Sequence, residues 1–175
     1  MTRLLLLFIL LGGFNTASAE WNSYLSTDKN NSAKEGFAFS DWTALSPSLD
    51  WPDDKIEAAL VAGCNDRGEK TLYVRMLSNY PATDTARSTD VVRGQVKWDS
   101  SNAYGAPFTY DANLNALRLR SGLEDSLSLI EEGNTVTIQI PWYDGHIAVF
   151  EFSLSGSSQA LKKAFEYCVA DIRSS

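Results

Sequence analysis

The stretch from Asn134 to Cys168 constrains the fold more than any other part of this 175-residue chain. Apolar and polar residues alternate with period two from Thr135 to Ile140, as in a half-buried strand. Asp144-Gly145 follows and accepts the backbone angles of a tight hairpin turn. A second run, from Ile147 to Leu154, is rich in β-branched and aromatic residues. The first part of the stretch therefore predicts a β-hairpin.

The second part of the stretch predicts a helix. Ser155-Gly156-Ser157 interrupts the strand pattern, and a serine at this point can cap a helix by accepting a backbone N–H. Leu161, Ala164, Phe165 and Cys168 then recur at i, i+3, i+4 and i+7, which places them on one helical face. We expect this helix to lie on a sheet, with Cys168 on its buried side.

The first 19 residues have the pattern of a signal peptide. Arg3 supplies a short positive region, an apolar run extends from Leu4 to Leu11, and Ala17-Ser18-Ala19 matches a small-residue cleavage site. We expect cleavage after Ala19 and a periplasmic location. Later apolar runs are too short to span a bilayer, so no stable membrane insertion is expected after cleavage.

The remaining residues have the length of one domain. Residues 20–36 are polar and lack periodicity, so we expect a flexible N-terminal arm. Residues 37–175 are then expected to form a single β-rich domain, in which the segment Phe37 to Pro52 packs as irregular structure or a short helix.

Several further segments carry strand signals. Residues 56–64 and 71–77 flank a turn-forming loop and predict a hairpin, although the alanine-rich first arm is also compatible with a helix. Shorter strands are expected at 91–98, 107–110 and 116–120. Together these segments predict an α+β, β-rich fold of about six or seven antiparallel strands, either a sandwich or an open barrel, closed by the C-terminal helix.

A second helix is expected before the hairpin. Ser121-Gly122-Leu123-Glu124 matches a capping box, with Ser121 at the cap and Glu124 at the third position. Leu123, Leu127 and Ile130 form one apolar stripe, and Gly133 is expected to end the helix in the left-handed conformation.

The chain contains two cysteines, Cys64 and Cys168. An even cysteine count in an exported protein predicts a disulfide bond. Closing a loop of about 100 residues contributes on the order of 4–5 kcal/mol in the chain-entropy model. No C-x-x-C spacing is present to lower a thiol pKa, so we expect a structural bond rather than a redox site.

Charge and motifs narrow the possible functions. The net charge of −7 makes nucleic acid a poor partner. His146 is the only histidine, and no zinc, calcium, G-x-S-x-G or phosphate-loop pattern occurs. We therefore predict no catalytic residues, no metal, no cofactor and no enzymatic activity. Hydrolysis by a carboxylate pair stays as a third candidate, because the chain has 22 acidic residues.

The cluster PWYDGH at 141–146 is the best binding candidate in the sequence. Trp142, Tyr143, Asp144 and His146 surround the predicted hairpin turn, and aromatic residues at protruding turns are typical interface anchors. The alternative is that Trp142 folds back on the core. The polar segment 78–90 is either a second binding loop or an exposed connection.

Parts of the sequence resemble periplasmic accessory proteins of the type VI secretion apparatus, the TagO/VasI family. The F-x-F-x-L-x-G strand end from Phe150 and the following helix ending in Cys168 carry the resemblance, and the strands 72–76 and 91–99 match more weakly. One departure is that Met76 stands where that family has its first cysteine. The resemblance implies an accessory or binding protein of the Gram-negative envelope.

These observations predict an exported, single-disulfide protein that acts by contact with a protein partner in the envelope, as a TagO/VasI-like accessory protein. The alternative is a periplasmic inhibitor or immunity protein, because an acidic surface suits a basic hydrolase.

Overall fold

The computed structural model describes residues 21–27, 34–44, 56–77, 91–142 and 146–169, with side chains to residue 166. These residues form ten strands and two helices. The strands are β1 (Trp21–Thr27), β2 (Lys34–Ser40), β3 (Thr43–Ala44), β4 (Glu57–Asn65), β5 (Lys70–Met76), β6 (Val91–Trp98), β7 (Tyr104–Asp111), β8 (Ala116–Leu119), β9 (Thr135–Pro141) and β10 (Ile147–Ser153). The helices are α1 (Leu123–Glu132) and α2 (Ser157–Val169).

The strands form one antiparallel sheet in the order β1-β2-β4-β5-β8-β7-β6-β9-β10, and β3 pairs with β4. The sheet curves until β10 lies against β3 and β4. At this seam the indole N–H of Trp21 in β1 donates to the carbonyl oxygen of Ser153 in β10 at 2.8 Å. The architecture is therefore an open, strongly curved β-sheet with two helices, which confirms the predicted β-rich α+β class.

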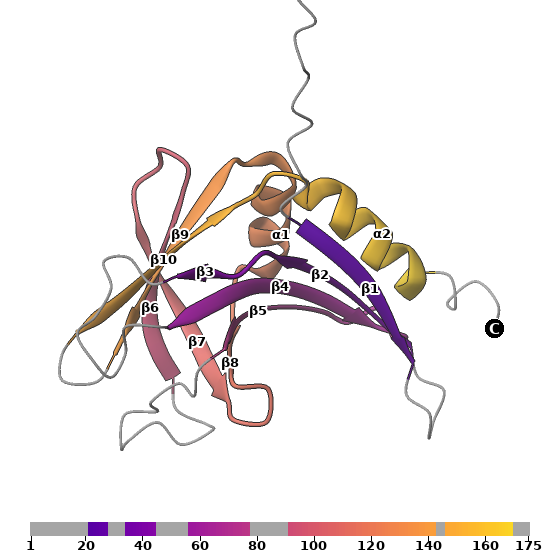
Figure 1. Cartoon of the computed structure of the whole chain (residues 1–175), viewed down its shortest axis with the longest axis horizontal. Coiled ribbons are helices and arrows are strands. Elements are labelled where there is room, and N and C mark those ends of the chain that lie inside the picture. Colours follow the sequence, from indigo (N-terminus) through magenta and orange to yellow (C-terminus); the bar gives the residue numbers. More distant parts are fainter. Residues whose placement is uncertain (1–20, 28–33, 45–55, 78–90, 143–145, 170–175) are drawn as a thin grey trace, which may run out of the picture.

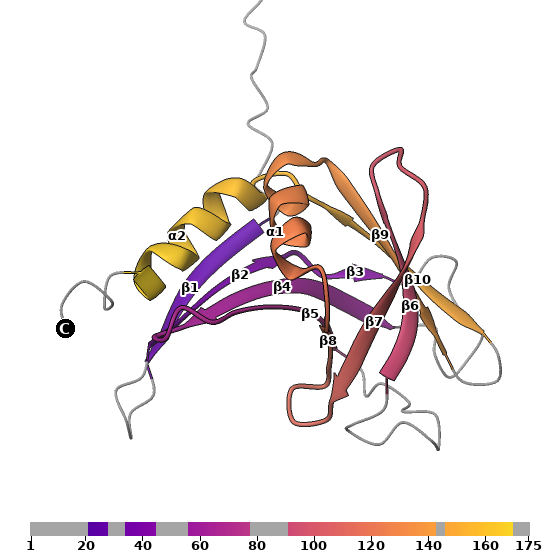
Figure 2. The same cartoon turned by 180° about the vertical axis from the view of Figure 1, so that it is seen from behind.

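The core follows from the period-two alternation of the strands. Val136, Ile138 and Ile140 of β9 are buried at 4% exposure or less, and Phe150 and Phe152 of the paired strand β10 join them. The two helices cover this inner face. Figures 1 and 2 show α2 lying along β1 and β2, with α1 beside its first turns. The Ser157 hydroxyl donates to the Ile130 carbonyl oxygen and joins the two helices.

Helix α2 approaches the sheet closely at Gly36. A Cβ atom at Gly36 would overlap the backbone carbonyl of Ala164, so a side chain at this position would push the helix away from β2. Leu161 and Ala164 are fully buried, whereas Lys162 and Lys163 are exposed. The predicted apolar face of this helix is thus confirmed for the side chains that the structure describes.

The N-terminal segment differs from the prediction. Residues 21–27 and 34–36 belong to β1 and β2 and do not form a flexible arm. Residues 37–40 continue β2, which the sequence had suggested as irregular structure or a short helix; residues 45–52 lie outside the described part of the chain. The strand β1 was missed because it is an edge strand whose residues are mostly exposed, so its sequence alternates only weakly.

The predicted hairpin at 56–77 is confirmed, and its alanine-rich arm is a strand rather than a helix. The predicted strands at 91–98, 107–110 and 116–120 are also present as β6, β7 and β8. The expected number of strands was too low because β1, β2 and β3 lie in segments that were assigned to an arm and to irregular structure.

The ends of α1 also differ from the prediction. Gly122, with φ 70°, is the N-cap and no side chain caps the helix, so the capping box does not form. Instead, the Glu124 carboxylate pairs with Lys70 Nζ at 2.9 Å. Gly133 is extended, with φ −84°, and is not left-handed. A Cβ atom there would lie 2.7 Å from the Leu129 carbonyl oxygen, so close packing requires this glycine.

The cysteine pairing stays a prediction, because the Cys168 side chain lies outside the described residues. Cys64 is 4% exposed, and no described cysteine is free. Cys64 is the register partner of Gly36, and Gly36 packs under Ala164, one helical turn before Cys168. The backbone therefore brings the two cysteine-bearing segments together.

We expect Gly36→Ala to destabilise the fold, because the new methyl group overlaps backbone that cannot move independently of α2. Overpacking of this kind costs about 1–3 kcal/mol or more. Gly105→Ala is the matched control, because no atom lies within 4 Å of its Cβ position. Denaturant unfolding measures both variants; equal free energies of unfolding would contradict the close contact between α2 and β2.

Candidate functional site

The described residues of the predicted binding cluster at the β9–β10 turn differ in burial. Trp142 is 3% exposed and belongs to the core, which is the alternative that the sequence left open. Its backbone N–H donates to the His146 carbonyl oxygen at 2.8 Å, and the His146 side chain is exposed. Tyr143 and Asp144 lie outside the described residues, as does the loop 78–90. A binding role for this turn stays a prediction, without the Trp142 ring as an exposed anchor.

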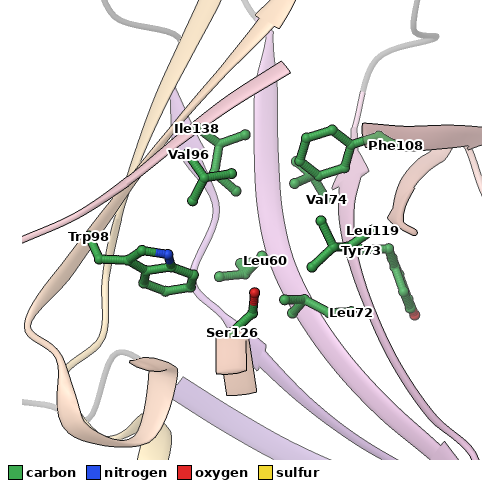
Figure 3. A pocket seen from close by; sticks show the side chains of 10 residues that line it. All are labelled: Leu60, Leu72, Tyr73, Val74, Val96, Trp98, Phe108, Leu119, Ser126 and Ile138. Carbon is green, nitrogen blue, oxygen red and sulfur yellow. The ribbon is translucent and has the colours of Figure 1, made fainter. Parts of the chain in front are cut away.

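The cavity that the described residues enclose inside the curved sheet is too small for a ligand. A cavity of about 10 Å³ lies between the sheet and α1, and its walls are almost entirely apolar. Figure 3 shows Leu60, Val96, Trp98 and Ile138 turned toward one another, with the Ser126 hydroxyl beneath them. A single water needs about 10–15 Å³ and several polar partners. Side chains therefore fill this space and leave no room for a small molecule.

The opposite, outer face of the sheet carries an aromatic cluster. Tyr24 of β1 stacks on Phe37 of β2 with ring centroids 5.1 Å apart, and meets Phe39 edge-on at 5.8 Å. Phe37 and Phe39 pack on a small apolar group that includes Val61 and Tyr73. We call Tyr24, Phe37, Phe39, Val61 and Tyr73 the outer aromatic cluster. The Tyr24 side chain is 50% exposed, so the cluster presents an aromatic surface to solvent.

A hollow of about 260 Å³, which we call the outer hollow, adjoins this cluster. Most of its lining residues lie on the face of β2, β4, β5 and β8 that is turned away from α2. Its walls include Glu35, Phe37, Glu69, Thr71, Tyr73 and Arg118. The hollow therefore combines aromatic rings with charged side chains of both signs.

Tyr73 forms part of the lining of the outer hollow and is 8% exposed. Figure 3 shows its ring turned away from the residues of the interior. Burial raises the pKa of Tyr73 to about 12, with a further contribution from Tyr24; the cations Arg75 and Arg118 oppose this shift. The hydroxyl thus stays protonated at neutral pH and can donate a hydrogen bond.

Two polar contacts organise the charged rim of the hollow. Arg118 contacts the Asp111 carboxylate at 3.4 Å, which offsets its charge. Asn65 donates from Nδ2 to the Glu69 carboxylate at 2.7 Å within the β4–β5 turn. Glu35 is exposed on β2 and has no ion pair among the described residues. Glu35 is therefore the carboxylate at this rim that is most available to a ligand.

The described residues also bear on metal sites and membrane spans. No group of three or more His, Cys, Asp or Glu side chains in this part of the chain is arranged to hold a metal ion. No described helix is long and apolar enough to cross a membrane.

The sequence reasoning missed the outer aromatic cluster. The alternation Phe37-Ala38-Phe39 was a usable signal for a strand with an aromatic face, but the segment was assigned to irregular structure. The position of Tyr24 opposite Phe37 depends on the β1–β2 register, which the sequence of β1 alone does not specify.

We expect Tyr73→Phe to change the alkaline stability of the protein. In the wild type the folded pKa of about 12 exceeds the ordinary value of 10, so folding stability is fully present below pH 10 and falls as the pH rises toward 12. The variant should lose less stability over this interval, as measured by denaturant unfolding at pH 9 to 12. If the wild type and Tyr73→Phe lose equal amounts of folding stability between pH 9 and 12, the buried position of the hydroxyl is contradicted.

Comparisons with known proteins bear on the fold alone. No family model matches this sequence, and no curated protein matches it in sequence. In structure, the chain is similar to invasion associated protein B from Bartonella henselae, with a TM-score of 0.51 and 8% identity. The similarity covers 85% of this chain and 93% of that chain. At this identity, the two proteins share an architecture over most of both chains.

Proposed function

We propose that this chain is an exported, single-disulfide binding protein that acts by contact with another protein of the bacterial envelope. The observation that carries this proposal is the outer aromatic cluster, whose outermost ring, Tyr24, is 50% exposed on the face of the sheet that neither helix covers. Aromatic residues are enriched in protein interfaces, where they bury large areas at a low entropic cost. Tyr24, stacked on Phe37, supplies such an area.

The mixed lining of the outer hollow favours binding. The described residues that surround it offer rings, a phenol, carboxylates and a guanidinium, which recognise another molecule without forming a metal centre. Within the described part of the chain, the cavity of about 10 Å³ between the sheet and α1 is smaller than most small molecules, so it does not compete with the outer hollow as a binding site. We infer that the protein works through its outer surface.

The location and the class of partner come from the sequence. The signal-peptide pattern of residues 1–19 supports export, and the pair Cys64 and Cys168 suits an oxidising compartment. The resemblance to the TagO/VasI family points to a component of the type VI secretion apparatus as the partner. The printed name of the structural neighbour associates that protein with invasion, which is compatible with an envelope or extracellular role for this chain.

A second candidate function is inhibition of a basic hydrolase in the periplasm. The observation in its favour is charge: the chain has a net charge of −7, and Glu35 and Glu69 stand at the rim of the outer hollow. An acidic surface attracts a basic partner and accelerates association. The two candidates differ in the identity of the partner and share the same contact surface.

Capture of envelope proteins by the mature, oxidised protein tests the proposal. The baits are the wild type, Tyr24→Ser in the outer aromatic cluster, and Tyr143→Ser in the predicted binding turn. We expect the wild type and Tyr143→Ser to retain a common partner and Tyr24→Ser to lose most of it. Circular dichroism and thermal unfolding of each bait establish that the variants are folded.

Each outcome of this capture has a definite meaning. A secretion-apparatus partner supports the accessory function, whereas a single basic hydrolase supports the inhibitor. Loss of the partner by Tyr143→Ser alone would move the contact surface to the β9–β10 turn and contradict the role of the outer aromatic cluster. A wild-type bait that retains no specific partner would overturn both binding functions.

A further inference from the structure

The outer hollow has one wall suited to a positively charged group. Glu35 projects from β2 at its rim, is exposed, and forms no ion pair among the described residues. Glu69, across the β4–β5 turn, adds a second carboxylate that is held by Asn65 at 2.7 Å. A carboxylate without a partner can form a charge-assisted hydrogen bond with an incoming ammonium or guanidinium group.

The ring of Phe37 provides a second element of recognition beside Glu35. The Phe37 ring lies over Gly63. A Cβ atom at Gly63 would lie 3.0 Å from two carbons of the Phe37 ring, so the ring can take this position because Gly63 has no side chain. Tyr24 supports the ring by stacking at 5.1 Å. A ring face held in this way, next to a carboxylate, favours cations through its quadrupole and packs against the aliphatic part of a long side chain.

Tyr73 supplies a hydrogen-bonding group in the same hollow. The residue is 8% exposed and lines the hollow, with Glu35 and Arg118 among its charged neighbours. A hydroxyl in this position accepts from an N–H donor or donates to a carbonyl oxygen. Because Tyr73 lines the hollow, a ligand side chain that enters the hollow comes near this hydroxyl.

The cation already present in the hollow does not occupy the acidic end. Arg118 lies on β8 and is held against Asp111 at 3.4 Å, so a carboxylate on its own side offsets its charge. Glu35 lies on β2, with β4 and β5 between these two strands in the sheet order. The net charge of −7 favours the approach of cations to the molecule as a whole.

We propose that the outer hollow is a binding site for an arginine or lysine side chain of a protein partner. The side chain packs its aliphatic part on the Phe37 ring, pairs with the Glu35 carboxylate and reaches the Tyr73 hydroxyl. This inference deepens the proposed function, on which it rests, because it names the chemistry by which the partner is recognised: a basic surface with a protruding cationic side chain. Arginine fits best, because its planar group stacks on a ring and binds a carboxylate through two N–H groups.

Two short peptides test this site without knowledge of the natural partner. The probes are acetyl-Gly-Arg-Gly-amide and acetyl-Gly-citrulline-Gly-amide, which have nearly the same shape and differ in charge. Nuclear magnetic resonance titration of the mature, oxidised protein follows the ring signals of Phe37 and Tyr73. We expect the arginine peptide to bind about tenfold more tightly than the citrulline peptide, because only the former makes a charge-assisted contact.

Matched variants locate the contact. Glu35→Gln removes the available carboxylate, and Glu166→Gln on the exposed side of α2 changes the net charge equally on the opposite face of the sheet. We expect Glu35→Gln to abolish the preference for arginine and Glu166→Gln to retain it. Tyr73→Phe should weaken binding by a smaller factor, because it deletes one hydroxyl and keeps the ring.

The outcomes separate this inference from the function on which it rests. Equal affinities for the two peptides, or an unchanged preference in Glu35→Gln, would overturn the cation site. If the wild-type bait still captures a partner that Tyr24→Ser loses, the binding function stands and only the recognition chemistry is wrong. If the arginine preference is present but no partner is captured from the envelope, the site stands and the proposed function fails.

Discussion

The packing of α2 against the inner face of β1, β2 and β4 is the contact on which the rest of the structure depends. The helix lies so close to β2 that Gly36 has no room for a side chain beneath Ala164. This contact covers one side of the N-terminal strands and, through Ser157 and Ile130, connects the helix to α1. Because both helices lie on the inner face, neither covers the outer face of these strands.

The two faces of the sheet consequently have different roles. The inner face carries the large buried side chains, such as Phe150 and Leu60, and leaves almost no internal space. The outer face carries a smaller buried apolar group flanked by the partly buried Phe37 and Phe39, and Tyr73 of this group lies beside Arg118. An exposed aromatic ring next to charged groups contributes little to folding stability, because the core on the inner face is already complete. The proposed binding function rests on this surface.

The elements that the sequence predicted correctly are those whose signal is local. The alternation in β9 and β10 and the helical spacing of Leu161 and Ala164 are each contained within a few residues. The errors arose where distant contacts decide the outcome. Strand β1 is an edge strand that is held by pairing with β2 and by α2, and the capping box at Ser121 failed because Gly122 adopts a left-handed conformation and Glu124 pairs with Lys70.

The sequence by itself determined the fold class, most of the strands, and both helices, because the periodicity of apolar residues encodes which face of each element is buried. It also carried the export pattern and the two cysteines on which the expected location depends. Only the tertiary structure decided the candidate site. Tyr24, Phe37, Tyr73 and Arg118 come from four different strands, and the antiparallel register that makes them neighbours depends on pairing energies summed over the whole sheet.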